Sequence, residues 1–360
     1  MPNSAETQLA DSHPNHDAGP TSACRARSRS RLYVLPAFIV LAITLGSLLL
    51  LRTLRQEPNP RDLARGLQQP GRRGWQSAYA LSQLLLAPEH DHLKDDARLC
   101  RALTATLARQ NEKARQATAA NEAPDEELIQ FRAFLCHVLG QFRVVDGLPV
   151  LLECVQAETD GRPSSRRPAR VRRAAIEAIA LLAANTGPEN VRAEPDVIPA
   201  LVAAAVAHDA SLATTPASTT PERDIPSAAT FALGVIGGRR ATAQLIELLE
   251  DIRPDVRYNA ATGLARRGRP EAMSVVLQML DPTSRVAWRD ERTESARARK
   301  RLIVRSNGIA AAARLIPVAA DDDQNKLIAA LEQLRDSQTA EPRIRVAAKE
   351  TLLKLAPPSR

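Results

Sequence analysis

Apolar residues recur along most of this chain at the spacing of one helix face, and one such stretch occurs twice. Within residues 225–281 the two copies align at a constant offset of 31 positions. In the second copy Val256, Ala260 and Leu264 lie on one side of a helix, and Gly268 follows as the residue that ends it. A second apolar stripe comes after the glycine. Each copy therefore predicts two helices joined by a glycine-containing turn.

A helical hairpin of this kind cannot bury its apolar face alone and must stack on copies of itself. The sequence therefore predicts an all-α fold, an α-solenoid of about six hairpins that ends in one capping helix. The array is expected over residues 75–357, with insertions at about 208–224 and 283–297. The expected hairpins cover residues 75–107, 126–155, 171–206, 225–249, 256–280 and 304–334, and the cap covers 344–355.

The repeated unit has a recognisable consensus. Residues 256–264 read Val-Arg-x-x-Ala-x-x-x-Leu, and Gly268, an apolar second helix and Asp281 follow. This pattern resembles the short HEAT-like repeat family of phycobilisome-lyase-type scaffolds. The resemblance implies a solenoid of HEAT-like hairpins whose second helices line the concave side. It concerns a repeat consensus, so it bears on the fold and says almost nothing about function.

The N-terminal part has a different character. Residues 1–31 are polar and basic without periodicity, which is typical of a disordered tail. Residues 32–51 carry no charge and span about 30 Å as a helix, the thickness of a bilayer core. A cleaved signal peptide is disfavoured, because no small-residue cleavage site follows the apolar run. We expect one transmembrane helix at 32–51 and a polar linker at 52–74.

The charges that flank the apolar run bear on the side of the membrane on which the array lies. Four arginines precede the apolar run within 20 residues and four follow it, so the positive-inside rule decides nothing. A basic tail, an apolar run and a large C-terminal domain are the order of a signal anchor. We expect a single-pass protein, of a bacterial inner membrane, and this order favours an array outside the cytoplasm.

The net charge of +8 raises the question of nucleic acid. Arginines are dense in two places, but neither cluster contains the interleaved aromatic residues that stack on bases. Nucleic-acid binding is therefore disfavoured. The clusters comprise Arg162, Arg166, Arg167, Arg170, Arg172 and Arg173, and then Arg297, Arg299, Lys300, Arg301 and Arg305.

Candidate chemistry is sparse. Residues 89–92 (Glu-His-Asp-His) have a metal-like composition, but a solvated loop is the favoured interpretation. His137, on a helix among apolar residues, is expected to be partly buried. The glycines of 233–238 follow a helix instead of a strand, so they indicate a turn and not a phosphate-binding loop. The four cysteines form no C-x-x-C pair, and Cys100, Cys136 and Cys154 are expected to be buried free thiols. We expect no metal, no cofactor and no catalysis.

Two classes of function stay open at this point. The leading hypothesis is a non-catalytic, membrane-anchored scaffold that docks another protein, with a membrane-associated complex as its setting. The alternative is a lyase-like chromophore-binding accessory or an arginine-mediated nucleic-acid binder. A salt titration separates these, because phosphate contacts weaken steeply with the logarithm of salt concentration.

A candidate docking surface follows from the expected core stripe of the two clear repeats. On their second helices a further face remains once the core positions are subtracted. Its apolar members Ile246 and Leu277 either pack on neighbouring helices or line a groove for an amphipathic, basic partner segment. The candidate partner-binding residues are Thr242, Ile246, Glu247, Glu250, Met273, Leu277, Gln278 and Asp281.

Overall fold

The computed structural model describes residues 59–67, 69, 71–123, 125–156, 168–207 and 221–355. Residues 1–58 belong to a separate unit. The expected tail at 1–31 and membrane helix at 32–51 therefore lie outside the described residues. Of the helices within the described ranges, none is long and apolar enough to cross a bilayer.

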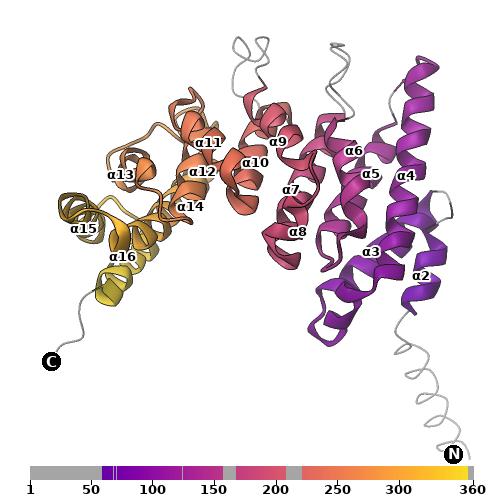
Figure 1. Ribbon diagram of the computed structural model, residues 1–360, viewed down its shortest axis with the longest axis horizontal. Coiled ribbons are helices and arrows are strands. Elements are labelled where there is room, and N and C mark those ends of the chain that lie inside the picture. The colour runs from indigo at the N-terminus through magenta and orange to yellow at the C-terminus, as the bar shows by residue number, and fades with distance from the viewer. Residues whose placement is uncertain are drawn as a thin grey trace, which may run out of the picture. The chain divides into compact units, whose positions relative to one another are not determined.

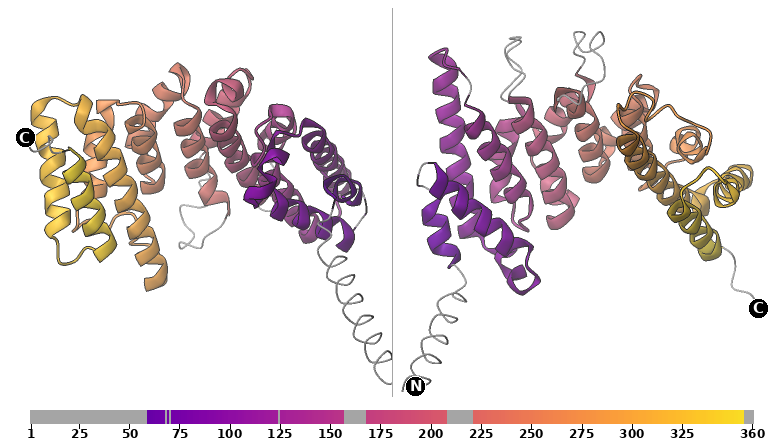
Figure 2. Two further views of the ribbon diagram at one scale, coloured as in Figure 1. Left: turned by 90° about the horizontal axis from the view of Figure 1, so that it is seen from below. Right: turned by 180° about the vertical axis from the view of Figure 1, so that it is seen from behind.

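All regular secondary structure in the described ranges is helical, and the helices follow one another in chain order along a row (Figures 1 and 2). The α-helices are α2 (Pro60–Gly66), α3 (Arg72–Leu86), α4 (Ala97–Ala119), α5 (Glu126–Gly140), α6 (Leu148–Gln156), α7 (Pro168–Thr186), α8 (Pro188–Arg192), α9 (Val197–Val206), α10 (Pro221–Ile236), α11 (Arg239–Glu247), α12 (Pro254–Ala265), α13 (Met273–Leu280), α14 (Glu294–Leu315), α15 (Asp321–Asp336) and α16 (Pro342–Leu355). Short 3-10 helices join several of them: η1 (Pro88–Asp95), η2 (Val145–Gly147), η4 (Leu248–Glu250), η5 (Pro270–Ala272) and η6 (Ile316–Val318).

The helices follow the order that the repeat pattern predicts: α3–α4, α5–α6, α7–α9 with short α8 between, α10–α11, α12–α13 and α14–α15, with α16 as the final helix. The two helices of a pair contact each other in α10–α11, α12–α13 and α14–α15, whereas α4, α6 and α9 pack mainly on the first helix of the next pair, and α16 packs on α14 and α15. The first helices α5, α7, α10, α12 and α14 contact each other in series. The prediction of an all-α solenoid is confirmed for this part of the chain.

Three expected boundaries differ. Residues 52–74 were expected to be a linker, yet α2 and the start of α3 lie there. The N-terminal parts of α10 and α14 likewise occupy the ends of the two expected insertions. In α14 the Thr293 hydroxyl accepts a hydrogen bond from the Ala296 N–H (3.2 Å), which fixes the helix start. The first turns of α14 consist largely of charged residues, and Lys300 among them forms an ion pair with Glu291. No apolar stripe therefore marks this part of the helix in the sequence.

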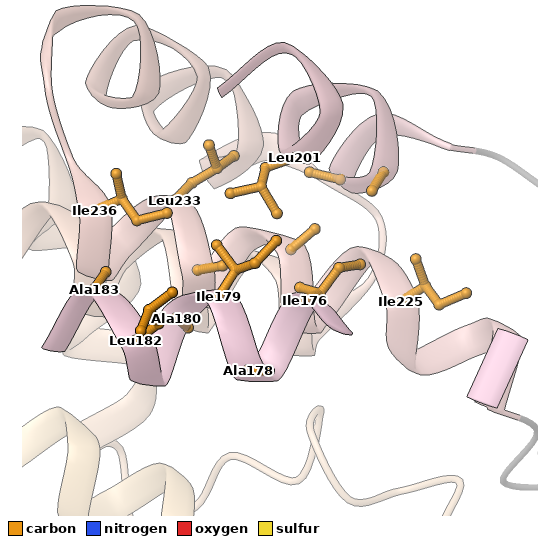
Figure 3. Packing of buried hydrophobic residues seen from close by; sticks show 14 of the residues in the cluster. Ile176, Ala178, Ile179, Ala180, Leu182, Ala183, Leu201, Ile225, Leu233 and Ile236 are labelled. Carbon is orange, nitrogen blue, oxygen red and sulfur yellow. The ribbon is translucent and has the colours of Figure 1, made fainter. Parts of the chain in front are cut away.

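The core forms where successive hairpins meet. Figure 3 shows Ile179 of α7, Leu201 of α9, and Leu233 and Ile236 of α10 packed together. Leu233 and its repeat counterpart Leu264 are both fully buried, as the alignment predicts. Small residues let neighbouring hairpins approach in this way. As a result α7 is buried along most of its length.

Two glycines make a close approach between neighbouring hairpins. A Cβ atom on Gly263 of α12 would lie 2.7 Å from the Gly234 Cα of α10, and one on Gly234 would lie 2.9 Å from the Gly263 Cα. Gly140 of α5 similarly faces the backbone of Ala178 in α7. The first helices therefore pack backbone to backbone, which only glycine permits at these positions.

Candidate docking surface

The surface predicted on the second helices is only partly available. Met273 is buried in the core, and Ile246 and Leu277 are partly buried and pack against it. Of the two alternatives for Ile246 and Leu277, the structure agrees with packing on neighbouring helices, and Met273 is buried as well. The physical reason is length: α11 has 9 residues and α13 has 8, and both pack against helices on more than one side. An apolar residue on their flank reaches a neighbouring helix.

The polar members of that surface remain accessible. Glu247, Glu250 and Gln278 are exposed, and Thr242 and Asp281 are half-buried. The Asp281 carboxylate accepts hydrogen bonds from the Thr283 N–H and hydroxyl, at 2.8 and 2.7 Å, so it stabilises the turn after α13. Partner binding at these residues stays a prediction.

An open groove of about 430 Å³ lies instead on the first helices. It runs across α7, α10 and α12, and its lining is polar or charged apart from one alanine and one aromatic ring. The Asn259 amide of α12 donates to the Ser227 carbonyl and hydroxyl oxygens of α10, both at 2.9 Å. This bond fixes the floor of the groove. The lining residues are Arg173, Glu177, Ser227, Ala228, Phe231 and Asn259.

Phe231 is the aromatic residue of this groove and is 39% exposed. The Arg266 guanidinium of α12 lies over its ring, with Cζ 5.2 Å from the ring centroid. Burial lowers the pKa of Arg266, and the nearby charges of Arg314 and Arg267 lower it further. Among the described residues, no carboxylate pairs with Arg266 or Arg314. We call Phe231, Arg266 and Arg314 the first-helix patch.

The first-helix patch was missed in the sequence, although one signal pointed to it. In the repeat alignment Phe231 falls opposite Thr262, a polar residue, so the position faces solvent. A large aromatic residue at a solvent-facing position of one repeat is the pattern of a contact site.

The second arginine cluster is largely neutralised by carboxylates. Lys300 Nζ lies 2.8 Å from Asp255 Oδ2 and 3.1 Å from Glu291 Oε1. Burial alone would lower the pKa of Lys300, but these two carboxylates raise it. Arg301 and the buried Arg305 both pair with Glu341, and Arg305 also lies over the Trp288 ring. These charges hold α12, α14 and α16 together.

Other arginines bind the carbonyl ends of neighbouring helices. Arg192 donates to the Ile236 carbonyl at the end of α10 (2.7 Å). Arg267 donates to the Gly234 carbonyl (2.6 Å), and Arg253 to the Ala205 carbonyl at the end of α9 (3.2 Å). These contacts satisfy helix C-terminal carbonyls that lack an intrahelical partner. Much of the basic composition therefore has a structural role.

The histidine segment is not a loop. It forms η1, where Asp91 binds Lys94 (2.9 Å) and Arg143 (2.7 Å). Hydrogen bonds from these two cations lower the pKa of Asp91. No group of three or more metal-ligating side chains occurs within the described ranges. His137, expected to be partly buried, is exposed on α5.

The glycine and cysteine expectations hold. Gly237, Gly238 and Gly268 have φ values of 65°, 94° and 62°, so they form turns after helices. The three described cysteines are unbridged and buried.

Comparison with known proteins agrees with the repeat architecture. A sequence-family profile for HEAT repeats matches residues 213–295, which contain the two clear repeats. No curated protein matches the sequence.

Three solved structures show a distant likeness. The CpcE–CpcF complex of phycocyanin lyase from Nostoc sp. PCC7120 is 18% identical, with 83% of this chain and 95% of that chain covered and a TM-score of 0.45. YibA of E. coli is 16% identical, with 82% and 93% covered and a TM-score of 0.32. Human deoxyhypusine hydroxylase is 15% identical, with 84% and 97% covered and a TM-score of 0.27. The match to HEAT repeats at 213–295 is therefore the most specific finding.

Proposed function

We propose that this protein is a non-catalytic docking scaffold, and that the first-helix patch binds an acidic segment of a partner protein. One observation carries the proposal: an exposed aromatic ring lies beside Arg266, the charge of Arg314 acts on Arg266, and neither arginine pairs with a carboxylate among the described residues. Arginine and aromatic side chains are the residues on which binding energy concentrates at protein interfaces.

The chemistry of the occupant follows from the charges. Arg266 and Arg314 repel each other, and a carboxylate between them removes that repulsion and forms charge-assisted hydrogen bonds. The adjacent groove accepts an apolar side chain against Phe231. An acidic segment with one aliphatic or aromatic residue fits both features. The helix-to-helix contacts below the patch hold it in place before binding, which lowers the ordering cost.

Nucleic acid is the less favoured occupant. Of the second arginine cluster, Lys300, Arg301 and Arg305 are already bound to carboxylates, so they are not available to phosphates. Phe231 offers one ring, whereas single-stranded nucleic acid is bound by several stacked aromatics.

The docking proposal is tested with the full-length chain. The partner is identified by tagged co-purification and mass spectrometry, and its affinity for the purified protein is then measured by calorimetry. We expect Phe231→Ala and Arg266→Ala each to weaken binding about tenfold or more. Arg239→Ala is the matched control, because Arg239 is exposed on α11 outside the patch. Equal affinities for all four proteins contradict the proposal. If labelled RNA or DNA binds in a salt-sensitive way and Arg266→Ala abolishes that binding, the occupant of the patch is nucleic acid and not a protein.

We also propose that residues 32–51 anchor the scaffold in a membrane. The support is the uncharged 20-residue run between Arg31 and Arg52. The full chain should stay in the membrane fraction after a high-salt or carbonate wash, and the chain without residues 1–51 should leave it. Release of the full chain by the wash contradicts the anchor. Alkaline phosphatase fused after Arg360 shows on which side of the membrane the array lies. The phosphatase is expected to be active if the array lies outside the cytoplasm.

A further inference from the structure

One side of α16, the last helix of the array, carries exposed apolar residues. The helix lies at the end of the row in Figures 1 and 2 and packs on α14 and α15. Val346 and Leu353, about two turns apart along the helix, are 54% and 66% exposed. The end of a solenoid is normally polar, because an apolar end attracts other molecules. An apolar end on α16 therefore indicates a contact surface.

The repeat pattern shows which side of α16 this is. The first helices align on the buried residues that open their core stripes, which are Phe131, Val171, Ile225, Val256, Val304 and Ile344. In this alignment Leu353 takes the position of Gly234 in α10 and Gly140 in α5. Gly234 faces Gly263 of the following α12, and Gly140 faces Ala178 of the following α7. The exposed side of α16 is therefore the side that meets the next hairpin in an internal repeat.

Two residues of α16 do not fit a further hairpin of the same kind. The earlier first helices have glycine or alanine at the position of Leu353, namely Gly140, Ala180, Gly234, Ala265 and Ala313. At the position of Lys349 they have buried uncharged residues, namely Cys136, Ile176, Thr230, Ala261 and Ile309. A leucine keeps the next helix away, and a lysine buried there without a partner is costly. The side therefore needs an occupant other than another repeat.

The charges on this side match a second copy of the same helix. Lys349 and Glu350 are exposed, and neither forms an ion pair with another described residue. Val346 and Leu353 lie equally far from the midpoint between these two charges. A two-fold axis through that midpoint sets two α16 helices antiparallel. Lys349 of each copy then lies opposite Glu350 of the other, and Val346 opposite Leu353. In a parallel pair, lysine would meet lysine.

We propose that α16 pairs with the α16 of a second copy of this chain, antiparallel and about a two-fold axis between Lys349 and Glu350. The further exposed charges of α16, Arg343 and Lys354, lie outside the apolar pairs, where their long side chains reach solvent. One pair of helices is small beside a standard interface, so we expect a dissociation constant of about 1–100 µM. The pairing does not depend on the first-helix patch.

Sedimentation equilibrium of the full-length chain in density-matched detergent tests the pairing. We expect a monomer–dimer equilibrium that Leu353→Asp weakens by about tenfold or more, because a charge then faces Val346 of the second copy. Leu86→Asp is the matched control, since Leu86 is 57% exposed on α3, and it should leave the dissociation constant unchanged. Both leucines are exposed, so thermal melts followed by circular dichroism should match the original. A chain that stays monomeric at about 100 µM, or a dimer weakened equally by both changes or by neither, overturns the proposal.

Exchange of the two charges tests the pairing without touching the apolar residues. Lys349→Glu alone, or Glu350→Lys alone, places like charges opposite each other and should weaken the dimer by about tenfold. The chain with both changes has opposite charges again and should dimerise as the original does. An equimolar mixture of the two single variants should form a heterodimer for the same reason. If the double variant and the mixture are as weak as the single variants, the proposal is overturned.

Disulfide formation tests the orientation. In the full-length chain with Cys24→Ser, the described native cysteines are buried. A mixture of Val346→Cys and Leu353→Cys proteins should form a mixed disulfide on mild oxidation. Val346→Cys alone should form little, because its two copies lie about 10 Å apart along antiparallel helices, too far for a disulfide. A disulfide in Val346→Cys alone, formed as fast as the mixed one, overturns the antiparallel arrangement.

Discussion

Gly263→Leu should destabilise the array by about 3 kcal/mol or more. Even a Cβ at this position would lie 2.7 Å from the Gly234 Cα and 3.2 Å from Leu245, so α10 and α12 must separate. Separation exposes the core residues between two hairpins and disrupts the nearest-neighbour contact on which a solenoid depends. Chemical denaturation monitored by circular dichroism gives the change in unfolding free energy.

The matched control for this change is Ala184→Leu. Ala184 is a small residue on α7, as Gly263 is on α12, but it is exposed. It should change the unfolding free energy by less than about 0.5 kcal/mol. If Gly263→Leu unfolds at the same denaturant concentration as the original protein, the first helices do not pack backbone to backbone.

Glu341→Ala should destabilise the C-terminal end by about 3 kcal/mol, because it leaves Arg305 without its carboxylate. Arg305 is 2% exposed, and its guanidinium lies 3.1 Å from Glu341 Oε2. Its Nη2 also donates to the Pro282 carbonyl (2.8 Å), so the group cannot turn to solvent without losing a second contact. Asp336→Ala is the control, since that carboxylate pairs with Arg335 on the surface.

The Glu341 carboxylate also makes the stability of the folded protein depend on pH. Burial alone would raise the pKa of Glu341, but hydrogen bonding from Arg301 and the charge of Arg305 lower it below its ordinary value. Stability from this group is thus complete above the unfolded-state pKa of about 4.3 and is lost as pH falls through the folded-state value. Glu341→Gln should flatten this part of the stability profile. An unchanged acid limb in Glu341→Gln contradicts the role of this ion pair.

The sequence predicted the core of the clear repeats because their spacing is regular. Leu233 and Leu264 are buried, and Gly268 ends its helix with a positive φ, as the alignment required. The contact of Gly263 is not visible in the repeat pattern, because Gly263 faces Gly234 of the preceding hairpin. A periodic pattern identifies a buried face but not the helix that covers it.

The candidate site was harder to predict for the same reason. Ile246 and Leu277 lie beside the core stripe in the sequence, but only the positions of neighbouring helices decide that they are covered. The arginines that bind helix ends also need such information, since Arg267 acts on the carbonyl of Gly234, 33 residues away. Phe231 was accessible to sequence reasoning through its polar counterpart, Thr262.

The central claim is that the first-helix patch selects an acidic segment, and a charge-reversal selection tests it most directly. The immobilised full-length chain is used to select from a displayed library of random peptides. The account predicts enrichment of Asp and Glu next to an aliphatic or aromatic residue. Arg266→Glu with Arg314→Glu should switch the preference to Lys and Arg, because the patch then presents negative charge. Arg239→Glu with Arg240→Glu, on α11, should leave it acidic. The account is contradicted if the selected peptides stay acidic in the variant with Arg266→Glu and Arg314→Glu. It is also contradicted if they become basic in the variant with Arg239→Glu and Arg240→Glu.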